Sequence, residues 1–117
     1  MSDITIYHNP RCSKSRATLA LLQERGVSPA IVLYLDDPPD ARELTDLLRK
    51  LGMRATQLVR RGEADYKAGG LDRESSDEQV LAAMAKHPKL IERPIVVRGE
   101  RAVLGRPPEN VLALLGE

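Results

Sequence analysis

The sequence predicts an α/β fold built on a mixed four-stranded sheet flanked by helices. Two strand-like runs near the start, residues 4–7 and 31–35, are separated by a helical pattern, an order that gives a parallel pair. Two later apolar runs, residues 95–97 and 102–104, enclose Arg98-Gly99-Glu100-Arg101, which is typical of an antiparallel hairpin. Helical patterns fill the chain between these two halves, so we expect a helical insertion there.

The first half is predicted to be strand, helix, strand. Ile4 to Tyr7 is rich in β-branched and aromatic residues, which favour strands. Ala17 to Arg25 has the leucine spacing of a helix, and Gly26 is a natural stop at its C-terminus. Ile31 to Leu35 is a continuous apolar run, which is expected of a strand covered on both faces.

The insertion is predicted to begin with an amphipathic helix. Asp40 and Glu43 resemble a capping box, in which Asp replaces the usual Ser or Thr. The leucines that follow have the i, i+3, i+4, i+7 spacing of one helix face, and Gly52 ends the pattern. Residues 54–75 are polar and weakly patterned, which indicates a short helix plus loops.

Two more helices are predicted towards the end of the chain. Ser75–Glu78 and Ser76–Gln79 are overlapping capping-box candidates before a helix that ends at Pro88. Pro107-Pro108 then opens a final helix after the hairpin. The resulting order, β-α-β, helices, β-β-α, is the layout of a thioredoxin-like domain with helices inserted between its βαβ and ββα halves.

Cys12 is the only cysteine, and its setting is that of a reactive thiol. It lies at a strand-to-helix turn, where unpaired backbone N–H groups and the helix dipole favour an anion. Arg11, Lys14 and Arg16 add positive charge, so we expect a thiol pKa below that of free cysteine and a nucleophilic thiolate. A lone cysteine is more often a small buried hydrophobe, but these charged neighbours argue against that interpretation.

Composition excludes several classes of protein. The 117 residues fit one domain, spanning 1–117. Eighteen basic and 17 acidic residues give a net charge of +1, which argues against a nucleic-acid binder. One cysteine cannot form an internal disulfide, no apolar run approaches the ~20 residues of a membrane span, and no signal-peptide pattern is present. We therefore expect a cytoplasmic monomer without nucleic-acid or membrane partners.

Three further arginines, Arg60, Arg93 and Arg106, occupy suggestive positions near turns and strand ends. The planar guanidinium group matches oxyanions such as phosphate. Spacing alone does not show that these side chains converge on Cys12, and a single arginine is more often a solvated surface charge. His8 precedes the thiol by four residues and could stabilise the thiolate when protonated.

Other catalytic chemistry lacks its motif. A tyrosine-phosphatase loop needs an arginine six positions after the cysteine, and this chain has Thr18 there. A phosphate-binding loop with Gly-Lys-Ser/Thr is absent from the sequence. His8 and His87 with one cysteine do not make a zinc site, so no metal is expected.

Several motifs in the same order carry a resemblance to a known family. The segment around the thiol is His8-Asn9-Pro10-x-Cys12-x-x-Ser15-Arg16. The others are Leu33-Tyr34-Leu35 before a proline-containing turn, Leu58-x-Arg60, Asp77-Glu78, His87-Pro88-x-Leu90-Ile91-x-Arg93-Pro94-Ile95-Val96-Val97 and Arg106-Pro107. Together they resemble the glutaredoxin-linked arsenate reductases, the ArsC family, over nearly the whole chain. The segment Asn-Pro-Arg-Cys-Ser-Lys-Ser-Arg is most similar to the housekeeping branch of arsenate reductase-like proteins.

The resemblance implies a role for each matching residue. Cys12 would be the catalytic nucleophile, and His8 and Ser15 would tune its thiolate. Pro94 would be the cis-proline that faces the active site of thioredoxin-like proteins. The oxyanion of arsenate would be held by three arginines: Arg60, Arg93 and Arg106.

The resemblance also implies the reaction. The Cys12 thiolate would attack arsenic(V), and arsenite would be released without a metal or a bound organic cofactor. Ser15 stands where a Cys-x-x-Cys protein has its second cysteine, so glutathione as co-substrate and glutaredoxin as partner would supply the external thiols. Arsenic-resistance members carry Gly-Thr-Ser where this chain has Ser13-Lys14-Ser15, which leaves open the preferred substrate. Whether a further cation joins the site is also open: Arg11, Lys14, Arg54 or Arg61.

Two other functions fit the same residues. A thiol-disulfide oxidoreductase acting on glutathione mixed disulfides would use Cys12 without needing all three arginines. An Spx-like regulator that binds RNA polymerase would share the fold, but many such proteins carry a Cys-x-x-Cys redox switch that Ser15 removes. Retention of the three arginines favours the oxyanion reductase.

Overall fold

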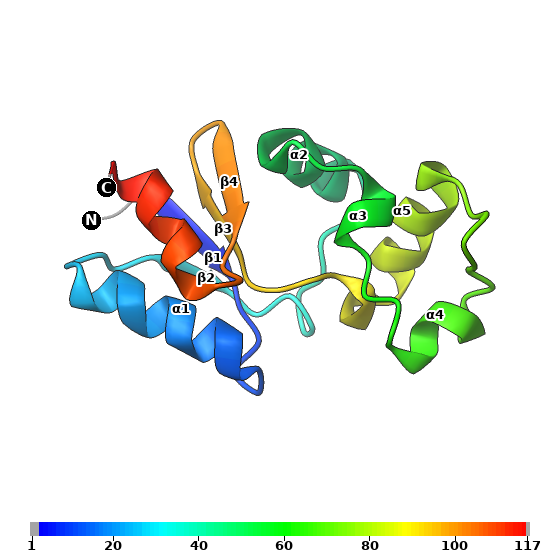
Figure 1. Ribbon diagram of the computed structural model, residues 1–117, viewed down its shortest axis with the longest axis horizontal. Helices are drawn as coiled ribbons and strands as arrows, with labels where there is room; N and C mark the ends of the chain where they lie inside the picture. The colour runs from blue at the N-terminus through cyan, green and yellow to red at the C-terminus, as the bar shows by residue number, and fades with distance from the viewer. Residues whose placement is uncertain (1–2, 117) are drawn as a thin grey trace. The chain divides into compact units, whose positions relative to one another are not determined.

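The computed structural model describes residues 3–116, which include a four-stranded sheet of order β2-β1-β3-β4 (Figure 1). Strand β1 (Ile4–Tyr7) is parallel to β2 (Ala30–Val32) and antiparallel to β3 (Ile95–Arg98). Strand β3 forms the hairpin with β4 (Arg101–Leu104). The mixed four-stranded sheet predicted from the sequence is therefore confirmed.

The chain divides into two compact units. The first contains the sheet and is made of the chain up to Asp37 and from Arg93 onward, and the second, from Pro38 to Glu92, is the helical insertion. The single domain expected over residues 1–117 stays a prediction. Within residues 3–116, no helix is long and apolar enough to cross a membrane. The insertion contains α2 (Ala41–Leu51), α3 (Ala55–Leu58), α4 (Ala64–Ala68), α5 (Asp77–Lys86) and the 3-10 helix η1 (Pro88–Leu90).

Two helices pack together in the first unit, α1 (Ser13–Glu24) and the 3-10 helix η2 (Pro108–Leu115) (Figure 1). Helix α1 begins at Ser13 rather than at Ala17, because Cys12 takes the N-cap position. The final helix is a 3-10 helix, in which residues three apart lie on one face, and Val111 and Leu114 are accordingly both buried. The core beneath these helices contains Ile4, Ile6, Leu22, Val96, Val111 and Leu114.

The expectation that residues 31–35 form a strand covered on both faces is wrong. Strand β2 ends at Val32 and lies at an edge of the sheet, and the chain turns immediately afterwards. The exposed fractions of Ile31 and Leu33 are 48% and 41%, whereas Tyr34 is buried. The apolar run is therefore divided between edge strand β2, whose Ile31 is exposed, and a turn in which Tyr34 is the buried side chain.

In the second unit, local capping signals set the helix starts. Asp40 caps α2 by accepting a hydrogen bond from the Glu43 N–H at 2.9 Å. Ser76 and Gln79 form the capping box of α5, which confirms one of the two overlapping candidates. Ser75 instead accepts a hydrogen bond from the Asp72 N–H at 3.0 Å. Residues 54–75 contain two short helices, α3 and α4, where one was expected.

Candidate active site

Cys12 stands at the N-cap of α1, with an extended backbone (φ −96°, ψ 122°). Its N–H donates to the Asn9 carbonyl at 3.0 Å, and its own carbonyl accepts from the Arg16 N–H at 3.0 Å. The thiol is half-buried. The strand-to-helix turn predicted for this residue is therefore present, and it leaves the sulfur accessible beside the first turn of the helix.

Side chains within the turn hold it in place. The buried Ser15 hydroxyl accepts a hydrogen bond from the Asn9 N–H at 3.0 Å and lies 2.6 Å from Nδ1 of His8. Arg16 donates from Nη1 to the Pro10 carbonyl at 2.9 Å. The backbone on the N-terminal side of Cys12 is thus tied to the helix that follows it, which fixes the position of the sulfur.

His8 is buried and shares its hydrogen bond with Ser15. Burial, and then the positive charge of Arg16, lower the pKa of His8. The neutral imidazole is therefore favoured at pH 7, and a protonated His8 beside the thiolate is not. We expect His8 to act on the thiolate by orienting Ser15, whose backbone N–H faces the sulfur.

Two of the three predicted arginines lie at the sulfur. Nη1 of Arg106 lies 3.9 Å from Sγ of Cys12 and donates to the Arg93 carbonyl at 3.3 Å. The Arg93 side chain also faces the thiol and lowers its pKa. The Arg93–Pro94 peptide bond is cis, and so is the Arg106–Pro107 bond, which sequence reasoning did not anticipate.

Opposing influences set the pKa of Cys12. Partial burial raises it, but the Ser15 N–H, the Arg93 side chain and the Lys14 N–H all donate towards the sulfur, and the charge of Arg93 adds to their effect. The net result is a pKa below the ordinary thiol value. The sulfur makes no capping hydrogen bond of ordinary geometry, so these N–H groups act at longer range. The arrangement favours a thiolate next to two guanidinium groups, which suits attack on an anionic electrophile.

Alkylation of Cys12 with iodoacetamide should follow this lowered pKa. The thiolate is the reacting form, so we expect the rate to rise with pH through a midpoint below the value of about 8.5 for a free cysteine. Replacing Arg93 by Gln should move the midpoint upwards, because a hydrogen bond and a positive charge at the sulfur are both lost. A wild-type midpoint at or above that of a cysteine-containing peptide would contradict the assignment.

Arg60 belongs to the second unit. Its Nη1 donates to Oε1 of Glu92 at 2.5 Å, and its Nε lies 3.4 Å from Oε1 of Glu63. In the same unit, Arg54 pairs with Asp77 at 2.9 Å, and Arg61 donates to the Thr56 carbonyl at 3.3 Å. A role for Arg60 at the oxyanion stays a prediction. The first unit brings together the other predicted residues: His8, Cys12, Ser15, Arg93, Pro94 and Arg106.

Sequence reasoning missed three residues that shape this site. Oδ1 of Asn9 accepts a hydrogen bond from the Arg11 N–H at 3.0 Å, so the side chain closes the turn before Cys12. The Asn-Pro dipeptide is a turn signal that could have identified it. Thr18 and Gly105 pack against each other beneath the turn, and nothing in the sequence pairs residues so far apart.

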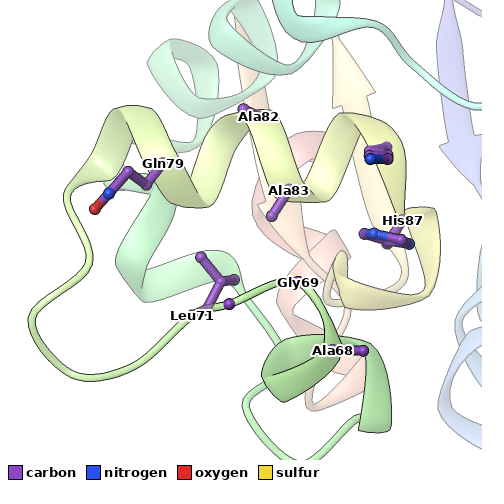
Figure 2. A pocket seen from close by; sticks show the side chains of 9 residues that line it. Ala68, Gly69, Leu71, Gln79, Ala82, Ala83 and His87 are labelled. Atoms are coloured by element: carbon purple, nitrogen blue, oxygen red, sulfur yellow. The ribbon is translucent and has the colours of Figure 1, made fainter.

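The second unit has a hollow of about 420 Å³ beside α5 (Figure 2). Gly69 and Leu71 border it on one side, and Gln79, Ala83 and His87 border it on the other. Nδ1 of His87 lies 4.0 Å from Oδ2 of Asp65. None of the predicted site residues lines this hollow, and the described part of the chain holds no cluster of three His, Cys, Asp or Glu side chains that could bind a metal.

Known proteins share this sequence and this fold. The model of the ArsC family matches residues 7–114. An arsenate reductase of Neisseria meningitidis serogroup A is 50% identical over 117 residues, covering 98% of this chain and 100% of that protein. A protein of Escherichia coli K12 that bears the name uncharacterized protein YfgD is 55% identical over 115 residues, covering 97% of each.

Solved structures agree with these sequence matches. An arsenate reductase from Vibrio cholerae has a TM-score of 0.89 at 50% identity, covering 94% of this chain and 95% of that one. The predicted thioredoxin-like fold, with its mixed sheet and flanking helices, is therefore confirmed. Sequence, fold and the thiol with its two arginines lead to the same assignment, and the chain belongs to the ArsC family.

Proposed function

We propose that this protein reduces arsenate to arsenite with Cys12 as the nucleophile, and that glutathione and glutaredoxin are the external thiols. The observation that carries the proposal is a thiol of lowered pKa at the start of α1 with Arg93 and Arg106 at its sulfur. Relatives named arsenate reductases, matched over nearly their whole length, support arsenate as the oxyanion. Arg60 is the third arginine proposed to bind it.

The first step joins sulfur to arsenic. The Cys12 thiolate attacks arsenic(V), an S–As bond forms, and one arsenate oxygen takes up two protons and leaves as water. The guanidinium groups of Arg93 and Arg106 offset the negative charge of the oxyanion and of the crowded intermediate. The Ser15 and Lys14 N–H groups lower the pKa of the attacking thiol before the reaction.

Reduction then needs two electrons that the chain does not hold. Its single cysteine cannot form an internal disulfide, and Ser15 occupies the position where a second thiol would stand. Glutathione and then the thiol of glutaredoxin supply the electrons and leave as one mixed disulfide, while arsenic passes from the V to the III state. Hydrolysis of the remaining S–As bond releases arsenite and returns the Cys12 thiol.

A coupled assay tests the proposal. NADPH oxidation is measured with the protein, arsenate, glutathione, glutaredoxin and glutathione reductase, and we expect it to stop when any one of these is omitted. Sulfate in place of arsenate is the matched control, because it is an oxyanion that the proposed thiols do not reduce. No arsenate-dependent oxidation, despite a thiol that alkylates readily, would overturn arsenate as the substrate. Reduction of a glutathione mixed disulfide would then support the oxidoreductase alternative.

A further inference from the structure

Thr18 is a fully buried polar side chain in the middle of α1, with an exposed fraction of 0%. Its Oγ1 donates to the Lys14 carbonyl at 2.8 Å, which is an ordinary bond for a threonine in a helix. The same hydroxyl lies 3.1 Å from the Gly105 carbonyl, 87 residues further along the chain. One hydroxyl hydrogen therefore serves both the helix that begins at Cys12 and the loop that leads to Arg106.

Gly105 fits this place because it has no side chain. A Cβ there would lie 2.5 Å from Oγ1 and 2.8 Å from Cγ2 of Thr18, and 2.9 Å from Cγ of Pro94. The Gly105 N–H donates to the Pro94 carbonyl at 2.9 Å. The backbone of Gly105 is thus packed against both Thr18 and Pro94, and a side chain at this position would collide with both.

This contact lies one residue before the arginine that reaches the sulfur. Arg106 follows Gly105 directly, and its Nη1 reaches to 3.9 Å from Sγ of Cys12. Thr18 lies in the helix that Cys12 caps, so its hydroxyl bond joins the loop before Arg106 to the element that carries the sulfur. A misplacement of about 1 Å at such a site can lower a rate about 100-fold.

We propose that Thr18 is a positioning residue, which through its hydroxyl bond to the Gly105 carbonyl sets the Arg106 guanidinium group against the Cys12 sulfur. For arsenate turnover this inference rests on the proposed function. The placement of a positive charge at the sulfur does not depend on that function, and this placement can be measured without arsenate. The hydroxyl of Thr18 contacts the Lys14 and Gly105 carbonyls, so it acts on the sulfur through Gly105 and Arg106.

Alkylation of Cys12 with two reagents measures the positive charge near its sulfur. Iodoacetate is an anion and iodoacetamide is neutral, so the ratio of their rates at Cys12 reports the positive charge near the sulfur. Thr18→Val keeps the shape of the side chain and removes the hydroxyl, and we expect the ratio to fall about fivefold towards that of Arg106→Gln. Thr18→Ser keeps the hydroxyl and should retain most of the wild-type ratio.

Thr45→Val is the matched control. Thr45 makes the same bond within a helix, to the Ala41 carbonyl at 2.7 Å, but it is exposed and lies in the second unit. It should leave the alkylation ratio unchanged. In the coupled assay, Thr18→Val should lower kcat/KM for arsenate about 10- to 100-fold while the KM for glutathione stays near the wild-type value.

If Thr18 only stabilised the fold, its replacement would change the melting temperature and not the alkylation ratio. A Thr18→Val protein with a lowered melting temperature but with an alkylation ratio and kcat/KM within twofold of wild type would overturn the proposal. Absence of arsenate turnover in the wild type would refute the proposed function alone, because the alkylation ratio would still decide the role of Thr18.

If Thr18→Val does not fold, Gly105→Ala tests the same contact from the opposite side. We expect it to lower the ratio, and the double variant with Thr18→Ala to stay low, since it removes the two closest atoms but also the hydroxyl that the proposal requires. A ratio in Gly105→Ala equal to that of the wild type would contradict the inference.

Discussion

Cys12→Ser should abolish arsenate-dependent NADPH oxidation, with a loss of at least about 1,000-fold. The serine hydroxyl keeps its proton at neutral pH, and no second thiol in the chain can replace the lost nucleophile. The Ser15 N–H and the Arg93 guanidinium group would then face an uncharged oxygen instead of a thiolate. The measurement is the coupled assay at saturating glutathione and glutaredoxin.

Ser13→Ala is the control for this prediction. Ser13 is the exposed first residue of α1 and is adjacent to the thiol in the chain. Its variant should turn over arsenate at a rate close to that of the wild type. Equal melting temperatures of the two variants would show that the loss in Cys12→Ser is chemical. Turnover that survives in Cys12→Ser would exclude the proposed mechanism.

Arg106→Gln and Arg93→Gln should each lower kcat/KM for arsenate about 100- to 1,000-fold, the usual effect of removing one donor to a developing oxyanion. The two variants should differ at the thiol. Arg93 lowers the pKa of Cys12, whereas Arg106, which donates to the sulfur over 3.9 Å, is not among the groups that lower it. The midpoint of alkylation should therefore move up further in Arg93→Gln than in Arg106→Gln.

Arg101→Gln provides the matched loss of charge. Arg101 is exposed on β4 of the same unit, so its removal changes the net charge equally without touching the sulfur. We expect its kcat/KM and its alkylation midpoint to stay close to those of the wild type. An equal loss in all three variants would mean that net charge, and not the placement of Arg93 and Arg106, governs the reaction.

The elements that the sequence predicted well are those with local causes. The hairpin follows from a glycine-containing turn between two apolar runs, and Gly99 takes a φ of +61° there. Asp40 and Ser76 cap their helices through atoms three residues away. The prediction of a strand at 31–35 that is covered on both faces was wrong, because coverage depends on the neighbours of a strand in the sheet, and β2 is at an edge.

The residues of the candidate site also fall into those with local causes and those that depend on distant parts of the chain. Cys12 could be predicted because a strand, a helix start and nearby cations all act within a few residues. Arg93 and Arg106 were named from the family resemblance, and their approach to the sulfur depends on the arrangement of the sheet. Thr18 served only to exclude a phosphatase loop, since its bond to Gly105 joins residues with no local relationship.

The sheet also fixes the order in which the site can be assembled. Strand β1 takes its antiparallel neighbour from residues 95–98, and Cys12 meets an arginine 94 positions later in the chain. Synthesis proceeds from the N-terminus, so the thiol is made early, whereas Arg93 and Arg106 are made near the end. Until β3 is paired, Cys12 lacks the hydrogen bond and the positive charge of Arg93, and its pKa is higher than in the folded protein. A Cys12 that reacts as fast as in the native protein is consequently a marker of completed folding.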